Sequence, residues 1–175
     1  MRKTIFETKR LIATTLQESD IEPLWRGCFS DWEVMKLLLG KTFTFEEAKE
    51  YIDRTFSKGQ LMDLTVVFEK ESRELIGYAG MFAYHFNNRG NEYEFGYILK
   101  PEAWGKGYAT ELSWGQIKKL QEVFADVSIV ATAHPQNIAS KRVLEKVDMV
   151  LVKPSVVLGN RGLRDVYILD KKGKR

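Results

Sequence analysis

Several features that define other classes of protein are absent from this sequence or rare in it. Cys28 is the single cysteine, which excludes an internal disulfide and is typical of a reducing compartment. Only two histidines accompany it, so we expect neither a structural zinc site nor any other metal cofactor. No apolar run approaches the ~20 residues of a membrane span. Residues 1–4 lead into alternating sequence rather than a signal peptide. We therefore expect a cytoplasmic protein without a membrane partner.

The net charge is also small. A formal charge of +3 is too weak to indicate nucleic-acid binding, and no stripe of basic and aromatic residues accompanies it, so we expect no nucleic-acid partner. The charge is unevenly spread, because residues 17–54 carry a net −4 and the remainder +7. This distribution fits either a cationic amine at one end and a polyphosphate at the other, or simply solvated helix faces.

Hydrophobic periodicity predicts a mixed α+β chain. A length of 175 residues, 44% of them apolar, fits one domain over 1–175 with a frayed basic tail at 171–175. Alternating or β-branched runs predict strands at 9–16, 64–68, 75–82, 91–99, 127–132, 149–158 and 163–169. Helical spacing predicts helices at 19–28, 44–59, 108–124 and 137–146, and turns at 87–91 and 159–162 separate strands.

The most informative stretch is 94–111, where a strand, a glycine turn and a helix follow one another. The strand stops at Pro101, which cannot donate a ladder hydrogen bond. Gly105-Lys106-Gly107 follows, and a helical pattern begins at Tyr108. Glycines let a ligand approach the backbone, and the first N–H groups of a helix point outward at the positive end of its dipole. This arrangement favours a phosphate, although the P-loop and dinucleotide patterns do not fit and an ordinary turn is the alternative.

Two carboxylates lie on the strand that precedes this turn. Side chains alternate between the faces of a strand, so Glu92 and Glu94 share one face with Gly96 and Ile98. The opposite face is apolar and carries Tyr93, Phe95, Tyr97 and Leu99. Carboxylates ~6.5–7 Å apart are expected to raise each other's pKa. A base of that kind suits an ammonium substrate, because the nucleophile is the neutral amine. A solvated strand face paired to lysines is the alternative.

The glycine stretch resembles a known signature. Ala-Trp-Gly-Lys-Gly-Tyr-Ala-Thr-Glu at 103–111 is similar to the acetyl-CoA motif of the GNAT N-acetyltransferases, Gln/Arg-x-x-Gly-x-Gly/Ala, although Trp104 departs from it. This form resembles the branch that contains the ribosomal-protein N-terminal acetyltransferases RimJ and RimL. Thr8-Lys9-Arg10-Leu11 and Glu94-Phe95-Gly96-Tyr97 resemble two further motifs of that branch, although Ala13 stands where the branch usually has arginine.

A second segment, 134–146, is similar to the Asn-x-x-Ser segment of the same family. The resemblance implies that Asn137 bonds the pantetheine arm and that Ser140 faces the CoA sulfur. From the residues alone, Asn137 is also an N-cap candidate and Ser140 a surface hydroxyl. Asp148 stands where the family has a helix-ending glycine, so we expect it in the left-handed region.

The resemblance implies the GNAT fold, a central and mostly antiparallel sheet flanked by helices. It implies an N-acetyltransferase that uses acetyl-CoA as co-substrate and transfers its acetyl group to a primary amine by direct attack. Glu94 is the expected base with Glu92 as second choice, and Ser140 is expected to protonate or hydrogen-bond the departing thiolate. The expected cofactor contacts are Tyr97, Ile98, Leu99, Trp104, Gly105, Lys106, Gly107, Tyr108, Ala109, Thr110 and Asn137.

Four questions stay open at this point. The acceptor is a peptide N-terminus, a polyamine, an aminoglycoside-like amine or a metabolite amine, and the protein is a monomer or a homodimer. A CoA-binding regulatory domain without turnover is the alternative to an enzyme. Trp25, Phe29 and Trp32 belong either to the core or to the wall of the acceptor pocket.

Overall fold

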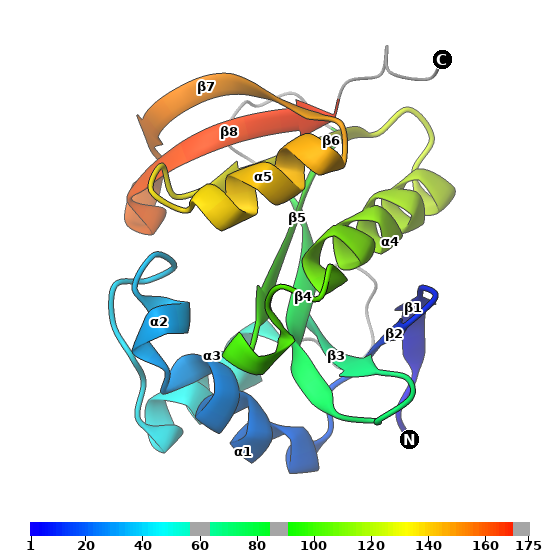
Figure 1. Ribbon diagram of the computed structural model, residues 1–175, viewed down its shortest axis with the longest axis vertical. Coiled ribbons are helices and arrows are strands. Elements are labelled where there is room, and N and C mark those ends of the chain that lie inside the picture. The colour runs from blue at the N-terminus through cyan, green and yellow to red at the C-terminus, as the bar shows by residue number, and fades with distance from the viewer. Residues whose placement is uncertain (57–63, 85–90, 170–175) are drawn as a thin grey trace.

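The computed structural model describes residues 1–56, 64–84 and 91–169, which contain one eight-stranded sheet with helices on both faces (Figure 1). In chain order the strands are β1 (Thr4–Glu7), β2 (Leu11–Thr14), β3 (Leu64–Glu69), β4 (Leu75–Ala83), β5 (Glu92–Leu99), β6 (Ser128–Ala133), β7 (Met149–Val157) and β8 (Leu163–Leu169). Their order across the sheet is β1-β2-β3-β4-β5-β6-β8-β7. Every neighbouring pair is antiparallel except β5 and β6. The expected mostly antiparallel sheet is confirmed.

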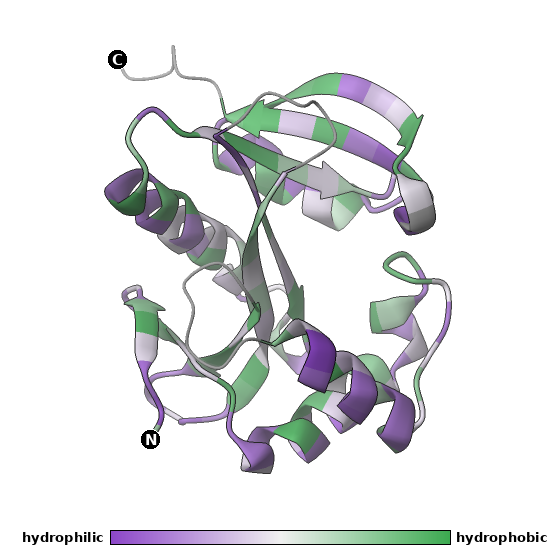
Figure 2. Cartoon of the chain, turned by 180° about the vertical axis from the view of Figure 1, so that it is seen from behind, coloured by the Kyte–Doolittle hydropathy of each residue, from purple (hydrophilic) through white to green (hydrophobic). Residues whose placement is uncertain are grey.

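Two groups of helices cover the two faces of this sheet. The α-helices of the described ranges are α1 (Ile21–Leu24), α2 (Trp32–Met35), α3 (Phe45–Thr55), α4 (Tyr108–Val123) and α5 (Ile138–Lys146). Helices α4 and α5 lie on the viewer's side of β5 in Figure 1 and pack on the cluster around Phe95 and Leu112. Helices α1–α3 pack on β3 and β4 through Phe29, Ile52 and Tyr78. Helix α3 comes to the front in Figure 2, where its outer surface is mainly hydrophilic.

The alternation expected along β5 is confirmed. Phe95 and Leu99 are buried in the cluster beneath α4 and α5, and Tyr97 packs against its edge. Ile98 contacts the cluster on the opposite face. Each face of β5 therefore has its own apolar neighbours, which fixes the register of the strand because a slip of one residue would exchange the two sets.

Strands β5 and β6 separate soon after they meet. Their parallel pairing covers only Glu92–Glu94 of β5 and Ser128–Val130 of β6. Beyond this point β5 stays paired to β4 as far as Leu99, and β6 stays paired to β8 as far as Ala133. We call the opening between residues 95–99 of β5 and 131–133 of β6 the β5–β6 wedge.

Most of the predicted elements are present, with corrections in the first third of the chain. Strand β1 was not predicted, and the strand expected at 9–16 is limited to Leu11–Thr14. The helix expected at 19–28 is wrong as a continuous element: it consists of a 3₁₀ turn at Glu18–Asp20, α1, and a π turn at Trp25–Phe29. The i+5 hydrogen bond of a π turn joins the N–H of Ser30 to the carbonyl of Trp25 at 2.8 Å. Helix α2 was also missed.

Local signals at other helix ends were more accurate. The predicted capping box of α3 is confirmed, because the Thr44 hydroxyl accepts from the N–H of Glu47 and the Glu47 carboxylate accepts from the N–H of Thr44. Helix α3 ends at Thr55, and the predicted end at Gly59 lies outside the described residues, as do most of the 87–91 turn and the 171–175 tail. Asp148 has a φ of 61°, which confirms the left-handed conformation expected of it.

One partly buried carboxylate, Glu111, joins the turn between β1 and β2 to the start of α4. Glu111, in the first turn of α4, accepts hydrogen bonds from the Thr8 hydroxyl at 2.6 Å and from the Arg10 backbone N–H and Nε at 2.7 Å each. Burial raises the pKa of Glu111, but these donors lower it by more, so that it lies below the ordinary carboxyl value. The Thr8-x-Arg10 motif therefore has a structural role, which is to hold the first turn of α4 against the β1–β2 turn.

This contact predicts a stability difference that depends on pH. Glu111→Gln should lower the free energy of unfolding by about 1.5–3 kcal/mol at neutral pH, because an amide cannot accept all three charge-assisted bonds. The loss should shrink as the pH falls through the folded-state pKa of Glu111, since a carboxyl with a lowered pKa stabilises the fold only while it is ionised. Denaturant unfolding of both proteins between pH 7 and pH 3 measures this.

The control is Glu22→Gln. Glu22 pairs with Arg26 at the surface, where both side chains are more than half exposed. Its replacement should leave stability almost unchanged at every pH. Equal losses for the two variants, or a Glu111→Gln loss that grows towards acid pH, would contradict the role given to Glu111.

Candidate active site

The β5–β6 wedge opens into a pocket of ≈ 390 Å³. From β5 and its face the pocket is lined by Glu94, Gly96, Tyr97 and Ile98, and from the opposite side by residues 131–134. Asn137 and Ser140 at the start of α5 also line it. The structure therefore brings the two segments singled out by the sequence, 94–99 and 137–140, to opposite walls of one pocket.

Beyond Glu94, the edge of β5 that faces β6 has no neighbouring strand among the described residues. Two bonds show which residues of β5 face β4: Lys100, just after β5, donates its N–H to the Ile76 carbonyl of β4, and the Glu92 carbonyl accepts the N–H of Tyr84, just after β4. In an antiparallel ladder the direction alternates, so even-numbered residues of β5 face β4 and odd-numbered residues face the other edge. Tyr97 and Leu99 lie beyond the last residue that pairs with β6, so their N–H groups point into the wedge. The Leu99 carbonyl accepts the Trp104 indole N–H at 2.8 Å.

The glycine turn lies where β5 leads into α4. Gly105 and Gly107 have φ values of +74° and +78°, in the left-handed region that favours glycine. Gly107 is the N-cap of α4 and offers no side chain to its first turn, so the N–H groups at 108–110 remain available to a ligand. A Cβ built on Gly105 would meet no atom within 4 Å. This geometry fits the anion site expected from the sequence.

Arg10 adds a positive charge beside this turn that the sequence analysis did not assign to the site. Its Nη1 donates to the Lys106 carbonyl at 3.0 Å, and its guanidinium lies 4.6 Å from the centre of the Tyr108 ring. Arg10 belongs to the Thr8–Leu11 motif, but its contact with Lys106 spans 96 residues and could not be predicted from a local pattern. A second cavity of ≈ 610 Å³, lined by Arg73, Lys100 and Lys106 among others, lies beside the same turn.

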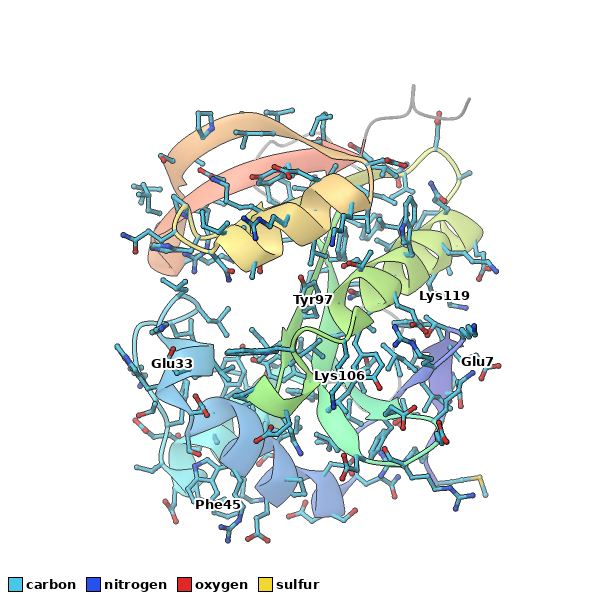
Figure 3. The ribbon with its side chains drawn as sticks, in the orientation of Figure 1. Glu7, Glu33, Phe45, Tyr97, Lys106 and Lys119 are labelled. Atoms are coloured by element: carbon cyan, nitrogen blue, oxygen red, sulfur yellow. The ribbon has the colours of Figure 1, made fainter. Side chains whose placement is uncertain are left out.

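Asn137 and Ser140 occupy the first turn of α5. The Asn137 side chain accepts the N–H of Ser140 at 3.0 Å, so Asn137 is the N-cap of this helix. The Ser140 hydroxyl lies against the phenol of Tyr97, which Figure 3 shows between α5 and the start of α4. Burial raises the pKa of Tyr97 to about 12, against a smaller lowering effect of Ser140, so the phenol stays protonated at neutral pH. Two hydroxyl donors thus face this end of the pocket.

Glu94 is the carboxylate of the pocket. It is 6% exposed, and its two oxygens accept hydrogen bonds from Thr132 Oγ1 at 2.7 Å and Arg161 Nη1 at 2.6 Å. Glu92 is 8% exposed, does not line the pocket, and its Oε2 has no hydrogen-bond partner in the part of the chain that the structure describes. A solvated strand face paired to lysines is therefore wrong for this pair, since both carboxylates are buried.

The remaining walls of the pocket come from segments that the sequence analysis did not assign to it. They are mainly apolar and aromatic, with two arginines near the chain's end: Leu37, Leu38, Leu39, Tyr51, Tyr78, Phe82, Arg161 and Arg164. Trp25, Phe29 and Trp32 do not line it. Phe29 is fully buried in the core and Trp32 is 54% exposed, so neither forms the acceptor wall that was one of the two expectations.

Comparison with known proteins gives one family and several relatives. The family described as an acetyltransferase (GNAT) domain matches residues 10–150. The "Uncharacterized N-acetyltransferase YnaD" of Bacillus subtilis (strain 168) is 30% identical over 142 residues, which cover 81% of this chain and 80% of that protein.

Solved structures agree. A GNAT-family acetyltransferase from Bacillus anthracis superposes with a TM-score of 0.77 at 25% identity, covering 97% of this chain and 98% of the other. A spermidine N-acetyltransferase from Vibrio cholerae, solved with CoA and spermine, gives 0.73 at 18% identity over 91% and 95% of the two chains. The expected fold is confirmed over nearly the whole chain.

The glycine turn yields a test of its own. Gly107→Ala should weaken the binding of CoA by about tenfold or more, because a methyl group would stand where a phosphate meets the first-turn N–H groups and charge-assisted bonds would be lost. Isothermal titration with CoA measures this. Gly107→Ala should also lower the unfolding free energy by about 1–2 kcal/mol, since alanine is strained at a positive φ.

Gly40→Ala separates the two effects. Gly40 has a φ of +68° and no atom within 4 Å of a built Cβ, so alanine there carries the same backbone strain away from the turn. It should lower stability to a similar extent and leave CoA affinity unchanged. An unchanged affinity in Gly107→Ala would reduce the turn to an ordinary helix start.

Proposed function

Because the chain belongs to the GNAT acetyltransferase family, we propose that it is an acetyl-CoA-dependent N-acetyltransferase acting on a primary amine in the cytoplasm. The observation that carries the proposal is the β5–β6 wedge, where an open edge of β5, the buried carboxylate of Glu94 and the first turn of α5 meet at one pocket. We also place the chain near the RimJ/RimL branch on its 8–11, 94–97 and 103–111 motifs.

The pantetheine arm would extend along the open edge of β5. Such an arm carries amide groups, which can pair with the N–H groups of Tyr97 and Leu99 as an added strand would. The pyrophosphate would lie on residues 105–109, where the first-turn N–H groups of α4 and the side chains of Lys106 and Arg10 offer positive charge. Asn137 would contact the arm from the opposite wall.

The acceptor amine would enter from the face of Glu94. Thr132 and Arg161 each occupy one of its oxygens, but a carboxylate has about four acceptor positions, so it can still take a proton from an ammonium group directly or through water. The freed amine would attack the thioester carbonyl. A wedge-facing N–H group of β5, that of Tyr97 or of Leu99, would stabilise the oxyanion, and collapse of the oxyanion would break the C–S bond.

The departing thiolate would be met by the hydroxyl groups at the start of α5. Ser140 lies at the position expected to face the sulfur, and the phenol of Tyr97 lies against it. We assign Ser140 as the hydrogen-bond or proton donor to the thiolate, with Tyr97 as the group that holds it in place or replaces it.

Binding of the co-substrate is the first test. Acetyl-CoA at ~100 times its Kd should stabilise the fold by about 2.7 kcal/mol, since it binds only the native state. For a domain of this size the melting temperature should rise by roughly 5–10 °C. The measurement is thermal unfolding with acetyl-CoA, with CoA and with ATP as a polyphosphate control. The proposal would be refuted if neither acetyl-CoA nor CoA, at millimolar concentration, raised the melting temperature. CoA binding without transfer to any amine would leave the regulatory alternative.

The role of the base has a matched control on the same strand. Glu94→Gln should lower kcat by roughly 10²–10⁴-fold with little change in CoA affinity, because glutamine keeps the shape but cannot accept the proton. Glu92→Gln alters the neighbouring buried carboxylate outside the pocket and should cost much less. A fall in kcat in Glu92→Gln alone would assign the role of the base to Glu92 in place of Glu94. Full activity in both would mean that positioning suffices.

A further inference from the structure

Arg164 is a buried arginine that forms no ion pair with another residue of the described ranges. The residue is 6% exposed and belongs to the wall of the ≈ 390 Å³ pocket. Its Nη1 donates to the Leu163 carbonyl at 2.8 Å and its Nη2 to the Leu38 carbonyl at 2.7 Å. Of the acidic residues that the structure describes, none forms an ion pair with it. These two bonds use two of the five N–H donors of the guanidinium.

Such an arrangement is costly in the absence of a ligand. A buried charge without a partner destabilises a protein by several kcal/mol as an order of magnitude. Burial and the neighbouring Arg161 lower the pKa of Arg164, and only Glu94 acts in the opposite direction. The single carboxylate of the pocket already bonds Arg161. The pocket therefore contains one more arginine than carboxylate.

We propose that the acceptor is an amino-acid-like molecule, whose anionic group binds Arg164 while its amine approaches Glu94. The inference rests on the proposed function and narrows its substrate class. An amine that also carries a carboxylate would give Arg164 a counter-charge, and its two opposite charges would face Glu94 and Arg164, which both line the pocket. Bidentate pairing of a guanidinium with a carboxylate gives both energy and orientation.

The same charges disfavour a polyamine. A second or third ammonium group would meet Arg161 and Arg164, and Glu94 alone would have to balance it. The acidic segment 17–54 does not help, because its contribution to the wall is Val34, residues 37–39 and Tyr51, all uncharged. Its carboxylates instead cap helices or pair at the surface, as Asp31, Glu47 and Glu22 do.

The rest of the pocket wall indicates what kind of side chain the acceptor carries. Leu37, Leu39, Tyr51, Tyr78 and Phe82 provide an apolar and aromatic wall. A hydrophobic side chain on the acceptor would remove its apolar surface from water there, which favours binding. The acceptor that fits all three features is a small zwitterion with an apolar side chain.

The test compares acceptors that differ in one charge. With saturating acetyl-CoA, kcat/KM is measured for L-phenylalanine and L-leucine, for their amides, for phenethylamine and for spermidine. The two amino acids should have a kcat/KM about 10–100-fold higher than that of their amides and of phenethylamine. Spermidine should be a poor acceptor. Equal kcat/KM for an amino acid and its amide, or a preference for spermidine, would overturn the inference. The proposed acetyltransferase function would still stand, because acetyl transfer would have been observed. Failure of every carboxylate-bearing amine, with acetyl-CoA still bound, would also overturn it.

Substitution of Arg164 separates recognition from support. In Arg164→Gln the ratio between L-phenylalanine and its amide should fall towards one, and in Arg164→Lys part of it should return with the charge. If Arg164 only holds the Leu38 and Leu163 carbonyls, its substitution should lower kcat/KM equally for both acceptors. The ratio would then stay unchanged, which would contradict the inference. The wild-type ratio stands as a test by itself where a variant does not fold.

Discussion

The short parallel pairing of β5 and β6 is the constraint on which the site depends. A sheet that stayed paired here would use the N–H groups of Tyr97 and Leu99 in its ladder and leave no room between its strands. Pairing ends at Glu94 and Val130 because β5 follows β4 while β6 follows β8. Under the proposed function, the separated edges would supply hydrogen-bonding groups to the cofactor arm, and Glu94 stands at the point of separation. The same break in the sheet would then set the positions of the proposed base and of the thioester.

The helices complete this opening from two directions. Helix α4 starts at the end of β5 with two left-handed glycines, and Glu111 ties its first turn to the β1–β2 turn, which also places Arg10 beside the anion site. Helix α5 starts at the end of β6 with Asn137 as its cap, which sets Ser140 next to Tyr97. Glu94 is held from the far side by Arg161, just before β8. The charged groups of the pocket therefore lie on strands or next to one: Glu94 on β5, Arg164 on β8 and Arg161 just before β8.

The sequence predicted the features that depend on neighbouring residues. Alternation along 91–99, the glycines at 105 and 107, the capping box at Thr44 and the conformation of Asp148 are all local, and all are present. Features that depend on distant contacts were missed. Strand β1 is four residues long and gains its place by pairing with β2, and Gly27 in the π turn lies where a Cβ would come within 2.5 Å of Lys100. Arg161 bonds Glu94, and Arg164 lines the same pocket, only because of the sheet order, which no local pattern encodes.

The central claim is that acetyl-CoA lies along the open edge of β5, and backbone hydrogen exchange tests it most directly. Exchange of the individual amides is measured by NMR with and without saturating acetyl-CoA, with the β1–β2 pair as an internal reference. Acetyl-CoA bound along this edge should slow exchange at Tyr97, at Leu99 and at residues 108–110 of α4, and should change exchange little in β1 and β2. Protection confined to the second cavity around Arg73 and Lys100, with Tyr97 and Leu99 unaffected, would contradict it.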